Sequence, residues 1–326
     1  MWLDEAYVSF GYADRIARGA GPFLLGQEVP TEYFSNPLWV ALFGLVGGLN
    51  IRESDVQVPL SVLAYVGLIY LVVQAVREKA SWPIAACSAA LLGLAPVVAA
   101  VRDGTDAVCL AALSLWAVRA ISQDIDRPSE GRQSACLLAV LSWTGLFGVV
   151  VALGLALVGV RRGRWRNLKI VVLMFGVLTA ARLVLYSTWL PPMSGREWSV
   201  SAFSWFPVWS ALALIGVVRC FRTERFLYAW VVLVGWGMAL TGMVESTGFG
   251  VSIVPTVGAM AVLFAETWSW LRIKSLGYAL VFAVLVVDAR TSEMALEEVR
   301  TERLSHYLQN KGMGRFLLWR FAPEDP

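Results

Sequence analysis

Long apolar runs are the feature that most constrains how this chain can fold. A helix needs about 20 mostly apolar residues to cross a bilayer, and several runs in the sequence approach or exceed that length. Charged residues make up only 16% of the chain, against about 25% in soluble domains, and the mean hydropathy is +0.64. These features predict an all-α fold, a polytopic bundle of membrane helices.

About ten spans are expected. The run 134–160 is interrupted by Trp143, Thr144 and Gly145, and we interpret it as two short half-spans that turn at depth; one long tilted helix is the alternative. Counted with this pair, the predicted spans cover residues 56–76, 82–101, 105–121, 134–160, 170–187, 203–218, 226–243, 250–271 and 275–288.

The distribution of basic residues predicts the orientation of the bundle. Loops on one side of the ten predicted spans hold fifteen Lys and Arg, and loops on the other side hold five. Cytoplasmic loops are enriched in Lys and Arg. We therefore expect the side with five basic residues, which includes both chain termini, to be extracytoplasmic. The chain then divides into an extracytoplasmic segment (1–54) with helices at 4–19 and 37–49, a bundle (55–289) and an amphipathic extracytoplasmic tail (290–326), within one structural domain.

The residue inventory excludes several kinds of site. The four cysteines match no metal or redox spacing, and the single histidine, His306, lies in the tail. A histidine-based metal site or a Ser-His-Asp triad within the membrane is therefore excluded, and no Walker A or GxGxxG loop is present in its usual context. We expect no cofactor, although a divalent metal stays open, and the net charge of +3 gives no indication of nucleic acid as a partner.

The most informative polar stretch is the first forty residues. It begins DEAYVSFGYA at Asp4 and ends YFSNPLW at Trp39. This stretch resembles the first extracytoplasmic loop of the GT-C superfamily of membrane glycosyltransferases, in particular the bacterial arabinofuranosyl- and mannosyltransferase-like branch. In that branch the loop runs D-[DE]-A-[YF]-[IV]-S-F-x-Y-A and ends Y-x-N-P-L-W, and nine positions of the first part fall in register here.

Weaker likenesses follow further along the chain. Gly104-Thr105-Asp106 resembles a second acidic motif, typically G-x-E-[TS], at a turn between spans. The segment from Arg182 to Pro191 resembles R-x-x-Y-Y-G-x-x-L-P-N-T, but Pro192 and Met193 stand where the family has Asn-Thr. The R-P-E-G sequence often found in the region of 134–160 is absent, and so is an arginine of the family between 226 and 271.

The resemblance implies roles for particular residues. Asp4 would be the catalytic base, with Glu5 beside it as the second acid of the catalytic pair. Arg102 and Arg182 would bind the phosphate of the donor. Residues that would orient donor or acceptor are Asp106, Tyr7, Tyr33 and Asn36. Structural roles are the alternative: helix-capping acids for Asp4, Glu5 and Asp106, a solvated flank for Arg102, and an ion pair for Arg182.

The resemblance implies a bacterial inner-membrane enzyme that transfers a sugar from a polyprenyl-phosphate donor to a glycan or lipid acceptor, on the extracytoplasmic face and among membrane lipids. The alternatives are a degenerate relative that serves as a scaffold or assembly partner and, third, a transporter, for which we find no internal repeat. In the family a transmembrane helix precedes the acidic pair. Here either the sequence begins downstream of the natural start, or it is truncated, or that helix has been lost.

Overall fold

The structure is a computed structural model, which describes residues 4–21, 36–49, 51, 53–102, 106–126, 132–161, 165–186, 207–220, 226–240, 254–270, 284–288 and 290. All regular secondary structure in these residues is helical, which confirms the predicted all-α class. The main helices are α1 (Asp4–Ala17), α2 (Pro37–Gly48), α3 (Glu53–Arg77), α4 (Trp82–Ala90), α5 (Ala95–Arg102), α6 (Asp106–Asp126), α7 (Arg132–Ser142), α8 (Leu146–Arg161), α9 (Trp165–Tyr186), α11 (Pro207–Cys220), α12 (Phe226–Leu240) and α13 (Val257–Trp270). Short 3-10 turns occupy Leu91–Gly93 and Val254–Thr256, and one π-helical turn occupies Val284–Asp288.

Three helices among the described residues are long and apolar enough to cross a membrane. They cover Asp55–Arg77 in α3, Asp106–Asp124 in α6 and Trp165–Tyr186 in α9, which is compatible with a membrane-embedded protein. Shorter apolar helices occupy other predicted spans, so the number of about ten stays a prediction. Most of the last predicted span and of the tail lies outside the described residues, and the division at 54 and 289 stays a prediction as well.

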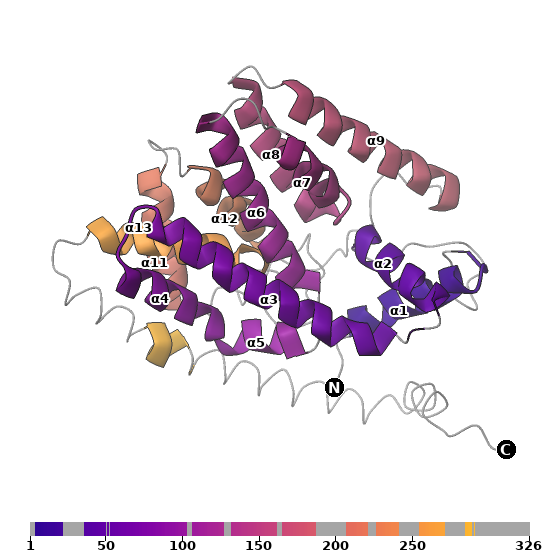
Figure 1. Ribbon diagram of the computed structural model, residues 1–326, viewed down its shortest axis with the longest axis horizontal. Helices are drawn as coiled ribbons and strands as arrows, with labels where there is room; N and C mark the ends of the chain where they lie inside the picture. The colour runs from indigo at the N-terminus through magenta and orange to yellow at the C-terminus, as the bar shows by residue number, and fades with distance from the viewer. Residues whose placement is uncertain are drawn as a thin grey trace.

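The two helices predicted in the N-terminal segment are both present. α1 is followed by Gly19, whose φ of +71° is a left-handed conformation that favours glycine. α2 begins at Pro37, where the missing N–H of proline has no helical partner to lose. In Figure 1 this pair lies together at one end of the molecule, away from α4, α11 and α13.

The predicted span over 82–101 is not a single continuous helix. α4 passes into the 3-10 turn at Leu91–Gly93, Leu94 is extended with ψ of 147°, and α5 starts at Ala95. Pro96 accounts for the interruption, because a proline has no N–H to donate to the carbonyl four residues before it in a continuous helix. The break turns α5 away from the line of α4 (Figure 1).

The expected interruption of 134–160 is confirmed. α7 and α8 are separate helices joined by Trp143, Thr144 and Gly145. The hydroxyl of Thr144 donates to the carbonyl of Leu141 at 2.7 Å, and Gly145 has φ of +97°. A side chain at Gly148 would overlap the Leu141 carbonyl and the Thr144 hydroxyl, so the sharp turn depends on glycine at that position.

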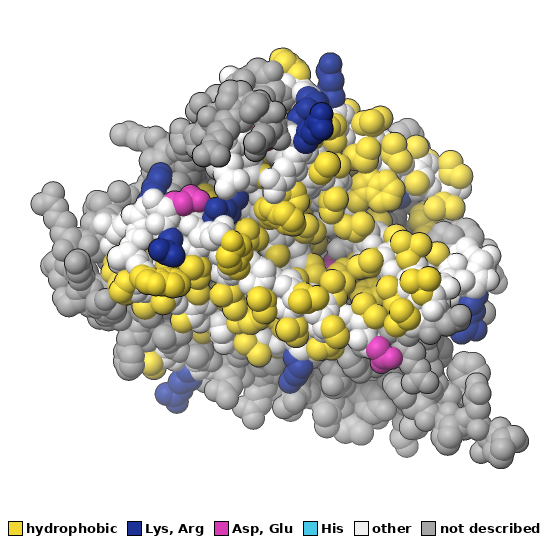
Figure 2. Space-filling model, viewed as in Figure 1, with side chains coloured by type: hydrophobic (Ala, Val, Ile, Leu, Met, Phe, Trp, Pro, Cys, Tyr) yellow, Lys and Arg dark blue, Asp and Glu magenta, His cyan; other side chains and the backbone are white. Residues whose placement is uncertain are grey.

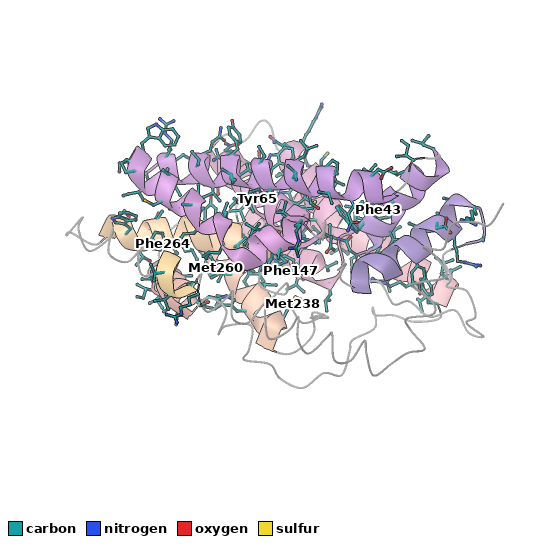
Figure 3. The ribbon with its side chains drawn as sticks, turned by 90° about the horizontal axis from the view of Figure 1, so that it is seen from below. Phe43, Tyr65, Phe147, Met238, Met260 and Phe264 are labelled. Carbon is teal, nitrogen blue, oxygen red and sulfur yellow. The ribbon has the colours of Figure 1, made fainter. Side chains whose placement is uncertain are left out.

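The core lies between α6, α8, α12 and α13. α13 is apolar around most of its circumference and its residues Val257 to Ala265 are nearly all buried, as expected for a helix surrounded by others. Figure 3 shows Phe147, Met260 and Phe264 in the body of the bundle and Phe43 apart from them, on α2. α3 and α9 carry many of the exposed large hydrophobic side chains, and on the face shown in Figure 2 hydrophobic side chains cover much of the described surface.

Candidate functional site

The acidic pair predicted to carry the chemistry lies in the first turn of α1. Asp4 and Glu5 begin the helix, and Tyr7 follows one turn later. The helix is described at these positions, but their side chains are not, and Tyr33 lies outside the described residues. The catalytic assignments to Asp4 and Glu5 therefore stay predictions.

Asn36 and Asp106, two of the predicted orienting residues, are in direct contact. The side-chain amide of Asn36 donates to a carboxylate oxygen of Asp106 at 2.6 Å, across 70 positions of sequence. The amide oxygen of Asn36 accepts from the backbone N–H of Trp39 at 3.1 Å, so the same side chain caps α2. One asparagine thus joins the start of α2 to the start of α6.

A second polar contact attaches α2 to the turn between α7 and α8. The backbone N–H of Leu38 donates to the carbonyl of Trp143 at 3.2 Å. This N–H belongs to the first turn of α2, where it has no partner inside its own helix. Trp143 takes part through its main-chain oxygen, which leaves no mark on the pattern of residue types.

Apolar contacts seat the α1–α2 pair on the bundle. One cluster joins Ala13, Trp39 and Phe43 to Val56 and Leu60 of α3 and Cys109 of α6. The rings of Trp39 and Phe43 meet edge to face with centroids 4.9 Å apart, an arrangement that aromatic pairs favour. Between α1 and α2 themselves, Ile16 lies against Gly44, where a Cβ would be only 3.0 Å from its side chain.

A second cluster brings the end of α9 to the same place. Tyr186, the last residue of α9, packs with Tyr12 of α1 and Val40 of α2. Arg182 lies one turn earlier in α9 and is buried, with 3% of its surface exposed. Two of the positions singled out from sequence, Arg182 and Asp106, therefore lie on helices that meet the α1–α2 pair.

Arg102 is placed differently from Arg182. It ends α5 with an exposed side chain, four residues before Asp106 begins α6. Basic side chains are favourable at a helix C-terminus, where the backbone carbonyls are unsatisfied. That position is consistent with the structural alternative, and its proposed contact with phosphate stays a prediction.

We call the meeting point of Asn36, Asp106, Trp143 and Tyr186 the junction. Its only charged member is Asp106, and among the described residues no Lys or Arg forms an ion pair with that carboxylate. A carboxyl group bound by one amide donor keeps further acceptor positions and can accept a hydrogen bond from a hydroxyl group. The described residues contain no group of three or more His, Cys, Asp or Glu side chains that could hold a metal ion.

Comparisons with known proteins add no relative. No family model matches the chain, no curated protein was found to match it, and no solved structure was found to match it.

Proposed function

We propose that this chain is a membrane glycosyltransferase of the GT-C type. It would transfer a sugar from a polyprenyl-phosphate donor to a cell-envelope acceptor on the extracytoplasmic face of a bacterial inner membrane. The proposal rests on the resemblance of the N-terminal stretch and of the turn at Asp106 to two acidic motifs of that superfamily.

One structural observation supports it. The hydrogen bond between Asn36 and Asp106 brings the end of the first motif against the second. Two segments that resemble parts of one site, 70 positions apart, therefore meet at the same end of the bundle. Two segments that belong to one site are expected to lie together in this way, which supports the proposal.

The proposed reaction needs one base and cations near the leaving group. The acceptor hydroxyl oxygen attacks the anomeric carbon of the sugar, its proton passes to the carboxylate of Asp4, and the bond between that carbon and the phosphate oxygen breaks. The electron pair leaves with polyprenyl phosphate, which is a stable anion and needs no strong acid. Arg182 and Arg102 would bind this phosphate, since guanidinium groups form charge-assisted hydrogen bonds to phosphate oxygens.

Asp106 would orient the acceptor in this scheme. Its bond to Asn36 fixes one carboxylate oxygen, which restricts how the group can turn. Holding reactants in a productive geometry lowers the entropic part of a barrier. Tyr7 and Tyr33 would complete the surface around the sugar.

A scaffold without activity is the second candidate. Asn36 uses both ends of its amide to hold α2 and α6 together, so a purely structural role also accounts for it. The Pro192-Met193 pair, in place of the Asn-Thr of the family, favours the same interpretation.

Turnover of a donor panel separates the two candidates. The protein would be incubated with several polyprenyl-phosphate sugars and a membrane lipid extract, comparing the native sequence with Asp4→Asn. Loss of a general base lowers kcat by about 100- to 10,000-fold. Asp14→Asn is the matched control, because it lies in the same helix and pairs with exposed Arg18, and it should leave turnover unchanged. A folded protein that consumes no donor would favour the scaffold.

A further inference from the structure

The turn between α3 and α4, residues 77–82, presents two exposed cations at the opposite end of α3 from the junction. Arg77 ends α3, Lys79 follows it, and both side chains are exposed. Glu78 stands between them but forms an ion pair with Arg119 of α6 at 2.9 Å. Since Arg119 offsets the charge of Glu78, the surface of the turn carries the two positive charges of Arg77 and Lys79.

The burial of Arg119 strengthens its ion pair with Glu78. Arg119 is buried with 9% of its surface exposed, and Asp124, further along α6, is buried too. A buried guanidinium holds its carboxylate partner firmly, because separating the pair would leave an unpaired charge inside the protein. Glu78 is therefore not available to neutralise Arg77 or Lys79.

An exposed aromatic ring lies beside these cations. Trp82 begins α4 and is 58% exposed, and the guanidinium carbon of Arg77 lies 4.8 Å from the centroid of its ring. This is cation–π geometry, and it holds the charge and the ring on one surface. Tryptophan is enriched where a membrane protein meets the lipid headgroups.

Below the turn, α3 carries an exposed apolar stripe. Leu63 is 68% exposed, and Val62, Val66 and Tyr70 beside it are exposed as well. Their spacing of three to four residues places them along one side of the helix. Tyr70 lies about two helical turns before Arg77, so the stripe leads up to the basic turn. Figure 2 shows this arrangement: hydrophobic side chains spread over α3, and basic ones gather at the end where α3 meets α4.

We propose that this surface binds an anionic glycerophospholipid. The phosphate of the headgroup would lie against Arg77 and Lys79 with Trp82 at the level of the glycerol, and an acyl chain would follow Val66, Leu63 and Val62 along α3. Two fixed cations complement an anionic headgroup and leave a neutral one without a counter-charge. The apolar stripe selects a lipid over free phosphate, which has nothing to place there.

The test uses the full chain in nanodiscs, with fluorescent phosphatidylglycerol and fluorescent phosphatidylcholine as probes. Energy transfer from Trp82 and the neighbouring tryptophans to each probe would be titrated, and native mass spectrometry would count the bound lipid. One basic residue near an anionic lipid surface contributes about a fivefold gain in affinity, so Arg77→Gln with Lys79→Gln should weaken phosphatidylglycerol binding by about 25-fold. Phosphatidylcholine binding should stay unchanged.

Two further variants guard the interpretation. Lys79→Gln alone leaves the stack of Arg77 on Trp82 intact and should cost about fivefold. Arg18→Gln removes an exposed cation at the other end of the molecule and should cost nothing. Equal affinity for the two lipids, or a double variant that binds phosphatidylglycerol as well as the native sequence does, would overturn the proposal. Circular dichroism of each variant confirms that it is folded.

Discussion

Separating Asn36 from Asp106 should cost more than separating any exposed ion pair of this protein. The bond between them is 2.6 Å long and joins an amide donor to a carboxylate, and Asn36 is only 6% exposed. Removing one partner of a buried hydrogen bond costs about 1–3 kcal/mol, because the other group is left unsatisfied. Asn36→Ser removes the donor but keeps a side-chain oxygen that can cap α2. We expect it to lower the free energy of unfolding by about 1–3 kcal/mol.

Asn36→Ala should cost more than Asn36→Ser. It removes the cap of α2 as well as the bond to Asp106, and loss of an N-cap side chain costs about another 1 kcal/mol. The difference in unfolding free energy between the two variants therefore measures the contribution of the cap. The loss caused by Asn36→Ser alone measures the contact with α6.

A double-mutant cycle isolates the contact itself. The cycle combines Asn36→Ser with Asp106→Ala, and residues in direct contact show coupling energies of about 0.5–3 kcal/mol. We expect a value of at least about 1 kcal/mol, because Asn36 is buried at this contact. The assay is reversible unfolding in mixed micelles with a denaturing detergent, followed by far-ultraviolet circular dichroism.

The exposed pair of Asp14 and Arg18 provides the control cycle. It joins two residues of α1 at 2.9 Å on the surface, and such helix pairs contribute about 0.3–0.5 kcal/mol. A coupling between Asn36 and Asp106 no larger than this control would refute the view that the contact fastens the α1–α2 pair to the bundle.

Three further predictions concern other contacts. Gly148→Ala should destabilise the protein by about 1–3 kcal/mol, because the new methyl group would meet the Leu141 carbonyl. Gly176→Ala should leave the stability unchanged, because the space around a Cβ at that position is open. Thermal unfolding of the two variants compares these effects. Glu78→Gln should lower the free energy of unfolding by about 1–3 kcal/mol, between the values for exposed and buried ion pairs. It leaves the buried Arg119 without its carboxylate partner, whereas Glu78 itself is 54% exposed. Thermal unfolding measures the loss, and a loss no larger than that of Asp14→Asn would contradict the prediction. Phe43→Ala should expose Cys109, which packs against the cluster containing Phe43. In a protein whose other three cysteines are replaced by alanine, a maleimide should label Cys109 faster when Phe43→Ala is added. An unchanged labelling rate would contradict this placement of Cys109.

The apolar pattern of the sequence was sufficient to predict much of the helical architecture. The turn at Trp143–Gly145 was also predictable, because a Thr-Gly pair interrupts an otherwise continuous apolar run. The span predicted over 82–101 did not specify the break at Leu94, although Gly93 and Pro96 lie close to it. Proline is tolerated in membrane helices when neighbouring groups satisfy the freed carbonyl, so its position alone did not decide between a kink and a break.

The contacts of the candidate site were less predictable than its members. The family resemblance singled out Asn36 and Asp106, and Arg182 also stood out as a charge within a predicted span. The bond between Asn36 and Asp106 depends on how α2 lies against α6. No local pattern encodes a contact across 70 positions. The oxygen of Trp143 was invisible for another reason, since any residue at that turn would supply a carbonyl.

Sided turnover in proteoliposomes tests the proposed function most directly. Vesicles of determined protein orientation would receive a polyprenyl-phosphate sugar in one leaflet, and mass spectrometry would follow donor, released polyprenyl phosphate and glycosylated acceptor. The proposal predicts one polyprenyl phosphate released for each sugar transferred, only with donor in the leaflet that contains the junction, and none with Asp4→Asn. Turnover from the leaflet at the α3–α4 turn, or full activity of Asp4→Asn, would contradict it.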